Sequence, residues 1–224
     1  YGLVGSEMCI RDSTGIDCPV KRAVSPEVIC RLMTDRKPLP GKLAFSRDLF
    51  VLLFLLRGMP FVDLAFLRRC DLQGNVITYH RRKTSRKLTV VVGKEAMEII
   101  QKYMYAIPDS PYLFPIIQNP GKDEYGQYAR MLRLQNYRLT QVANILGIRD
   151  RLSTYTARHT WATTALRQNY NSRLICDAMG HSSVKVTETY FQPYRDDEVN
   201  RMNSSLITYI LSKKKRGTDK KIRS

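Results

Sequence analysis

The longest apolar pattern in the chain lies between Leu43 and Leu56. Its apolar positions cover most of the circumference of a helix rather than a single stripe, which predicts a helix buried at the centre of the fold. Gly58 and Pro60 follow directly, and both residue types oppose the continuation of a helix. We therefore expect the buried helix to end at about Arg57.

Other stretches carry apolar stripes or start signals that predict further helices. Ser25, Pro26 and Glu27 form a helix-start signal, because serine caps a first turn, proline suits it and an acid is favourable at the positive end. The predicted helices lie at residues 25–33, 61–67, 94–106, 124–146 and 196–211, with two or three more between residues 155 and 190. A proline-rich loop is expected at residues 108–121.

The segment from Asn75 to Val92 has a different pattern. It contains two short, β-branched and partly alternating runs, VITYH and KLTVVV, with a polar link between them, which predicts a β-hairpin. The cations at its tip are Arg81, Arg82, Lys83, Arg86 and Lys87. A solubilising edge hairpin is one interpretation, but a tip with these cations and no acid favours contact with DNA phosphates.

These elements predict a mainly α fold with a small antiparallel β-hairpin or sheet, an α+β architecture. Residues 1–20 lack periodicity and resemble a translated sequencing artefact or a disordered leader, in which case the chain is a truncated piece of a longer protein. Residues 21–195 are expected to form the main domain. Residues 196–211 follow as a C-terminal helix, and residues 212–224 as a basic disordered tail.

Charge narrows the choice of partner. Lysine and arginine total 37 residues against 20 aspartate and glutamate, a formal net charge of +17, which favours a nucleic acid over an anionic membrane or a merely basic surface. The longest apolar run, Leu49 to Leu56, is far shorter than the roughly 20 residues that span a bilayer. The five scattered cysteines argue against a disulfide framework or a zinc site and favour a cytoplasmic protein without a metal.

The stretch from Tyr155 to Tyr190 concentrates residues suited to phosphodiester chemistry. Cleavage needs a nucleophile, cations for the non-bridging oxygens and an acid for the leaving oxygen. Arginine grips phosphate with a planar fork, and the stretch contains Arg158, His159 and His181 as well as the terminal tyrosine. A tyrosine hydroxyl becomes a useful nucleophile when cations or a base assist it.

The order and spacing of these residues carry a family resemblance. Arg158-His159, then Met179-Gly180-His181, then Tyr190 nine positions later resemble the signature of tyrosine recombinases, the phage-integrase family. The similarity extends from about Lys21 onward and includes RGMPFVDL, the RRKT hairpin and TARHTWATTAL. It implies the catalytic core of a DNA breaking-rejoining enzyme, similar to integrases of bacterial mobile elements, that needs no metal or cofactor.

The resemblance implies a role for each matching position. Arg158 would clamp the scissile phosphate, and His181 would hydrogen-bond the same phosphate and assist proton transfer. Lys83 would protonate the departing 5′ oxygen. Tyr190 would attack phosphorus and form a 3′-phosphotyrosine, while His159 is expected to be structural.

Two positions depart from the family pattern. Pro60 stands where the first catalytic arginine is usual, and Arg57 is the expected substitute, with Arg81 and Arg82 as alternatives. Tyr155 stands where a histidine precedes the clamp arginine; its phenol can still donate a hydrogen bond to phosphate. We expect a rearranged set of donors rather than an inactive site.

The resemblance also implies partners. Double-stranded DNA is the expected substrate, and strand exchange requires a synapse of several protomers, a homotetramer, in the bacterial cytoplasm at the nucleoid. The apolar stripe of the C-terminal helix either contacts a neighbouring protomer or packs on its own domain. Alternatives are a helix-turn-helix regulator without catalysis, a topoisomerase of the same chemistry, and an inactive integrase remnant.

Overall fold

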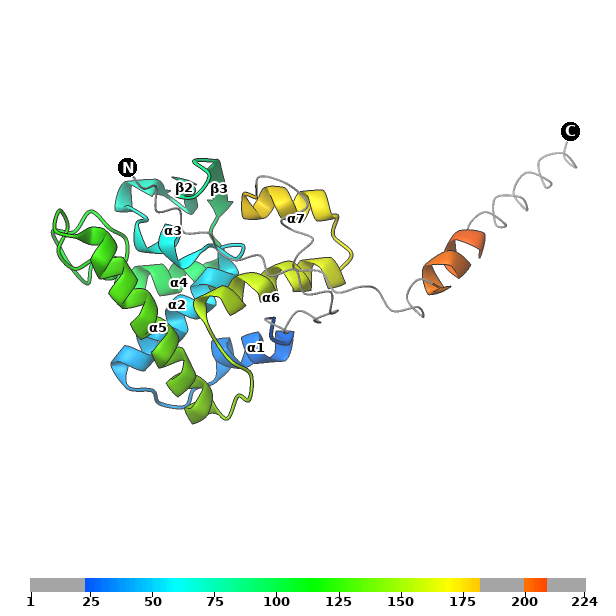
Figure 1. The fold of residues 1–224 in the computed structure, drawn as a ribbon, viewed down its shortest axis with the longest axis horizontal. Coiled ribbons are helices and arrows are strands. Elements are labelled where there is room, and N and C mark those ends of the chain that lie inside the picture. Colours follow the sequence, from blue (N-terminus) through cyan, green and yellow to red (C-terminus); the bar gives the residue numbers. More distant parts are fainter. Residues whose placement is uncertain (1–22, 182–199, 209–224) are drawn as a thin grey trace, which may run out of the picture.

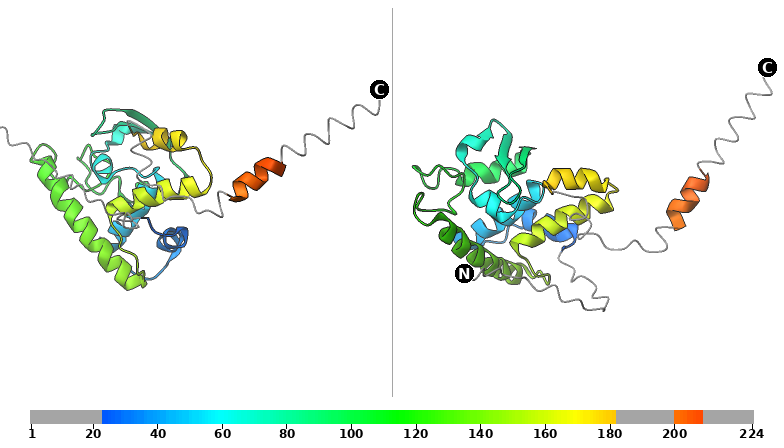
Figure 2. Two further views of the ribbon diagram at one scale, coloured as in Figure 1. Left: turned by 45° about the vertical axis from the view of Figure 1, so that its right-hand side comes forward. Right: turned by 45° about the horizontal axis from the view of Figure 1, so that its top comes forward.

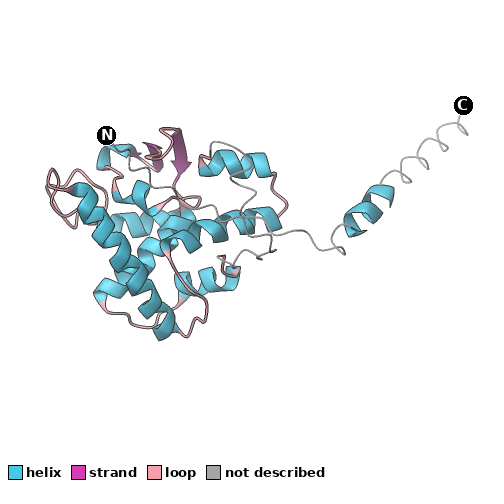
Figure 3. Cartoon of the chain, in the orientation of Figure 1, coloured by secondary structure: helices cyan, strands magenta, loops and turns pink. Residues whose placement is uncertain are grey.

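A computed structural model of the protein describes residues 23–181 and 200–208 (Figure 1). Most of the described elements are helices, and a small sheet lies at one end (Figure 3). The α-helices are α1 (Pro26–Thr34), α2 (Gly41–Leu55), α3 (Phe61–Ala65), α4 (Lys94–Tyr103), α5 (Glu124–Leu146), α6 (Thr154–Arg167) and α7 (Ser172–Met179). The strands are β1 (Leu72–Gln73), β2 (Val76–His80) and β3 (Lys87–Val91), and a short 3₁₀ helix, η1 (Arg69–Asp71), precedes β1. The predicted mainly helical α+β class is confirmed.

Helix α2 is the centre of the domain, as its apolar pattern predicts. Leu49, Phe50, Leu52 and Leu53 are each 0% exposed. The helix packs against α1, α4, α5 and α6, and the long α5 runs along one side of the domain (Figures 1 and 2). Helix α2 carries apolar residues on nearly all sides because other helices pack around most of its circumference.

The sheet has one strand more than the sequence predicts. Strands β2 and β3 form the expected antiparallel hairpin, with Thr78 opposite Thr89. Strand β1 pairs with the outer edge of β2, so the order is β1-β2-β3. A two-residue strand has no detectable alternation, which is why the sequence pattern does not indicate it.

The proline-rich segment at residues 108–121 is irregular, as predicted, yet it belongs to the core. Leu113, Phe114, Ile116 and Ile117 are at most 1% exposed. The N–H of Leu113 donates to the carbonyl of Leu67 at 2.8 Å, which fastens the segment to the chain that follows α3. The segment therefore closes the core beside α3 although it is neither helix nor strand.

An acidic side chain links α2 to α4. Asp48 is 6% exposed and accepts hydrogen bonds from Lys102 and Tyr103, both at 2.7 Å, and from Arg47 at 2.9 Å. Burial alone would raise the pKa of Asp48, but these donors together lower it. The carboxylate is therefore held in its charged form between the two helices.

Most predicted helix boundaries agree with the structure to within a few residues. Helix α5 has the predicted bounds, and Gly147 ends it in the left-handed conformation at φ 64°, while α4 ends three residues before the predicted Ala106. Residues 200–208 of the predicted C-terminal helix are helical. The predicted leader at residues 1–20 and the tail at 212–224 lie outside the described residues. None of the described helices combines the length and apolar character that a membrane span needs.

Candidate active site

Arg158 is the most buried cation of the site. It lies in the second turn of α6, a helix that begins with a reciprocal capping box between Ser153 and Thr156. The residue is 3% exposed, and its guanidinium donates to the carbonyl oxygens of Gly58 at 2.5 Å and Met179 at 3.0 Å. One planar fork thus joins the turn after α2 to the end of α7.

His181 lies directly against Arg158. Its Nε2 is 2.6 Å from Nη2 of Arg158. Since arginine can only donate, Nε2 must accept, and the neutral ring then carries its proton on Nδ1. The residue is 6% exposed. Burial, followed by the charges of Arg158, Arg81 and Lys83, lowers the pKa of His181 to about 4. The imidazole is therefore neutral at pH 7.

Two glycines shape the backbone around this pair. Gly58 (φ 66°) lies in the turn after α2, and a Cβ there would lie 3.1 Å from the Cα of Arg158. Gly180 (φ 65°) ends α7 and directs the next residue, His181, inward, where its N–H donates to the carbonyl of Cys176 at 3.0 Å. Both positions need the left-handed region that glycine adopts readily.

Arg57 approaches the site from the turn after α2. It also has a left-handed backbone, at φ 60°, and its Nη1 donates to the carbonyl of Thr89 on β3 at 3.2 Å. Pro60 is the N-cap residue of α3. Burial, followed by the charge of Asp63, raises the pKa of Tyr79, whereas the charges of Arg81, Arg158 and Arg57 act in the opposite direction. The three arginines therefore all lie close to one tyrosine on β2.

The cations of the hairpin tip divide into one buried and four exposed side chains. Arg82, Lys83, Arg86 and Lys87 are exposed, and the guanidinium of Arg82 lies 3.8 Å from the centre of the Phe66 ring.

Two of the hairpin arginines turn toward the rest of the site. Arg86 donates to Asp177 at 3.0 Å and to the carbonyl of His181 at 3.1 Å. The sequence predicts a DNA contact for Arg81 as well, but this residue is 7% exposed and its guanidinium points into the protein.

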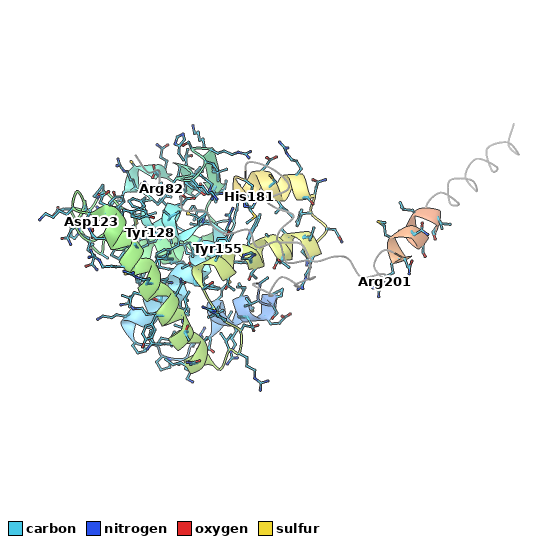
Figure 4. The ribbon with its side chains drawn as sticks, viewed as in Figure 1. Arg82, Asp123, Tyr128, Tyr155, His181 and Arg201 are labelled. Carbon is cyan, nitrogen blue, oxygen red and sulfur yellow. The ribbon has the colours of Figure 1, made fainter. Side chains whose placement is uncertain are left out.

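Tyr155 and His159 lie one turn apart on α6. Tyr155 is 51% exposed, and its ring meets that of His159 edge-on at 4.8 Å between centroids. His159 is 9% exposed, as expected for a structural residue. Figure 4 shows Tyr155 on α6 and His181 beside the end of α7. The described contacts bring Arg158 and His181 together, whereas Tyr155 lies at the surface of α6.

The nucleophile that the motif predicts, Tyr190, lies outside the described residues. The structure also places beside the site one acidic residue that the sequence analysis does not single out. Asp63 is 3% exposed and pairs with Arg81 at 3.1 Å. The signal for it was available, because a lone acid in the apolar run FVDLAFL must find a partner when the run is buried. Among the described residues, no group of three or more His, Cys, Asp or Glu side chains is arranged to hold a metal ion.

Comparison with known proteins gives this geometry a family. The model of the family described as "Phage integrase family" matches residues 23–196. The chain belongs to the phage integrase family. The match spans both the helical core and the Arg158–His181 site, so the resemblance inferred from the motifs is confirmed.

Relatives of this family member are distant. A tyrosine recombinase XerC from Thermodesulfovibrio yellowstonii is 26% identical over 167 residues, which are 68% of this chain and 52% of that protein. A second XerC, from Syntrophus aciditrophicus, is 24% identical over 165 residues, 68% of this chain and 51% of the relative. The chain thus spans about half the length of the curated relatives that it matches.

Solved structures share the fold. The Tn1549 transposon integrase in complex with transposon right end DNA superimposes with a TM-score of 0.62 at 14% identity, covering 85% of this chain and 68% of that one. The XerA recombinase superimposes with a TM-score of 0.58 at 20% identity, covering 82% and 64%. At these identities the comparison establishes the architecture alone, and that architecture is the one predicted from the motifs.

Proposed function

We propose that this protein is a site-specific DNA recombinase, an integrase that breaks a DNA phosphodiester with a tyrosine and rejoins the strands. The observation that carries the proposal is the buried contact between Arg158 and His181, which lies beside a hairpin with exposed cations. A chain of the phage integrase family with these residues in one site has the parts that phosphoryl transfer requires. Catalysis of such a reaction depends on fixed positive charge at the phosphate oxygens and on proton transfer.

In the proposed reaction, the phenolic oxygen of Tyr190 attacks phosphorus while the bond from phosphorus to the 5′ oxygen breaks. The phenolic proton passes to His181, and Lys83 gives a proton to the departing 5′ oxygen. The products are a 3′-phosphotyrosine and a 5′ hydroxyl. The new ester keeps the energy of the broken bond, so a 5′ hydroxyl of another strand reverses the step and rejoins the DNA. Two such rounds exchange the strands without a metal or a nucleotide.

Two cations hold the phosphate in this proposal. Arg158 binds the non-bridging oxygens, and Arg57 supplies the charge that Pro60 does not. Arg57 is the better substitute because it is only partly buried and its Nη1 donates to the carbonyl of Thr89 on β3, whereas Arg81 is buried and paired with an aspartate. Tyr155 donates a hydrogen bond to phosphate in place of a histidine.

Duplex DNA is the proposed substrate, and four protomers the proposed assembly. The related Tn1549 integrase was solved in complex with DNA, and the exposed cations Arg82, Lys83, Arg86 and Lys87 provide charge for phosphate contact on this chain. Residues 200–208 expose Met202, Leu206 and Ile207, each more than half accessible. We infer that this apolar stripe contacts a neighbouring protomer in the synapse.

The test is the capture of a covalent intermediate. The substrate is a pool of DNA duplexes with randomised core sequences. Across the pool, one strand carries a nick a few nucleotides to the 3′ side of each possible cleavage position. The short 5′-hydroxyl fragment then diffuses away and rejoining stops. We expect a protein–DNA adduct that survives denaturation and is absent for Tyr190→Phe, and sequencing the trapped strands gives the target site. Binding without any adduct would instead indicate a non-catalytic DNA-binding protein and contradict the proposal.

A further inference from the structure

A buried ion pair joins three parts of the site that are far apart in the sequence. Nε of Arg81 lies 3.1 Å from Oδ2 of Asp63, and Nη1 of Arg81 donates to the carbonyl oxygens of Met179 and Gly180 at 2.8 and 3.2 Å. The second carboxylate oxygen of Asp63 accepts the N–H of Arg82 at 3.0 Å. Helix α3, the turn after β2 and the end of α7 are therefore connected through one guanidinium.

The pair is packed directly against the catalytic residues. The carbonyl of Met179 accepts from Arg158 at 3.0 Å as well as from Arg81. A Cβ on Gly180 would lie 2.7 Å from Cδ of Arg81. The backbone of Gly180, directly before His181, is therefore packed against the Arg81 side chain. Any displacement of Arg81 would move an acceptor of Arg158 and the backbone before His181 together.

The same arginine fixes the turn that carries Lys83. Its N–H donates to the carbonyl of Arg86 at 2.9 Å, and its carbonyl accepts from the N–H of Ser85 at 2.7 Å. With the N–H of Arg82 held by Asp63, both ends of the turn are anchored. Lys83 is close enough for its charge to lower the pKa of His181.

Burial of this pair is costly and must be compensated. The side chains of Arg81 and Asp63 are 8% and 1% exposed, and the removal of both charges from water offsets most of their mutual attraction. Replacement of a buried ion pair by apolar residues of similar volume is often neutral for stability, so the attraction of the two charges alone does not account for this pair. The benefit of the ion pair lies in its directed hydrogen bonds, which hold three elements in one geometry.

We propose that Asp63 and Arg81 are a positioning pair that holds the Lys83 turn and His181 in the arrangement needed for protonation of the leaving oxygen, without either residue touching the DNA. This inference rests on the proposed recombinase function. It also assigns Arg81 to the protein interior rather than to the phosphate.

A sulfur atom at the bridging 5′ position distinguishes positioning from phosphate contact. A thiolate is a much better leaving group than an alkoxide because thiol pKa values lie near 8.5, so cleavage at sulfur needs no proton from Lys83. Loss of a proton donor is therefore rescued by sulfur. Loss of a cation that binds the non-bridging oxygens is not, since their charge develops in either case.

The experiment measures adduct formation on the nicked duplex selected from the pool, with oxygen or sulfur at the bridging position. Arg81→Gln and Asp63→Asn should each slow the oxygen reaction by roughly a hundredfold, the scale of a lost general acid, and sulfur should restore most of the rate. Arg47→Gln is the matched control, because Arg47 also pairs with a buried aspartate, Asp48, but at the contact between α2 and α4; its rates should equal those of the unchanged protein.

Asp63→Asn nearly preserves shape and leaves the arginine charge in place, so it remains informative if Arg81→Gln unfolds in a thermal melt. A slow reaction that sulfur does not rescue would show that the loss lies in phosphate binding, by Arg81 itself or through Arg158, and would overturn the proposed role in protonation of the leaving oxygen. Unchanged rates in both variants would overturn it too. If the unchanged protein forms no adduct on either duplex, the recombinase function itself fails, and the inference with it.

Discussion

At the scale of single residues, the unusual feature is a histidine that accepts a hydrogen bond from an arginine. Phosphate binding would reverse this arrangement, because a phosphate oxygen can only accept and would take over the donors of Arg158. His181 can then hydrogen-bond the same phosphate only by donating through Nε2. The proton of the neutral ring is therefore expected to move from Nδ1 to Nε2 when DNA binds, and Nδ1 is then the nitrogen that accepts the phenolic proton.

This expectation is testable by titration of His181. In the DNA-free protein the imidazole should titrate near pH 4 with its proton on Nδ1, well below the ordinary value near 6.5. In the complex of Tyr190→Phe with the selected duplex, the pKa should rise, because the anionic phosphate favours the charged ring. Nitrogen NMR measures both, and His181→Gln identifies the signal among the three histidines. A midpoint near 6.5 without DNA would contradict the buried arginine–histidine contact.

The motif residues could be recognised in the sequence because their chemistry is fixed by the reaction. Arg158 and His181 were both predicted, and the structure brings them into contact. Their roles in catalysis, like those of Lys83 and Tyr190, stay predictions. The pairing of Asp63 with Arg81 could not be read from the sequence, because it depends on how α3 and the hairpin pack, 18 positions apart along the chain.

At the scale of elements, the sequence predicts segments with a regular apolar period and does not predict the structure of segments without one. Helices α2 and α5 follow from long apolar patterns and a terminal glycine. Strand β1 is too short to alternate, and the segment around Phe114 is buried without a periodic pattern. Such segments are positioned by tertiary contacts alone, such as the bond from Leu113 to Leu67.

The link between α2 and α4 allows a stability prediction. Asp48→Ala should lower the free energy of unfolding by about 3 kcal/mol at pH 7, because donors of Lys102, Tyr103 and Arg47 lose a buried carboxylate. The pKa of Asp48 is lowered in the fold, so its contribution is fully present above the unfolded pKa and is lost as pH falls through the folded pKa.

Urea denaturation at several pH values measures this difference. The deficit of Asp48→Ala relative to the unchanged protein should shrink below about pH 4. Glu98→Ala is the control, since it removes an equal charge from an exposed position on α4 and should change stability by less than about 0.5 kcal/mol. A deficit that is equal at pH 3 and pH 7 would show that packing, not charge, makes this link.

At the scale of the whole molecule, the domain holds Arg158 and His181 in contact, and the chain spans about half of its relatives' length. In the proposed reaction, Tyr190 becomes covalently attached to DNA. A histidine, serine or cysteine adduct would require a different reaction, even if denaturing gels looked the same.

The most direct test is mass spectrometry of the trapped adduct after digestion with protease and nuclease. We expect one modified peptide, with a nucleotide joined through a 3′ phosphate to the hydroxyl of Tyr190. No such peptide should form with Tyr190→Phe, while Tyr194→Phe, a tyrosine four positions further along, should leave it intact. A nucleotide attached to any other residue, or through a 5′ phosphate, would contradict the account.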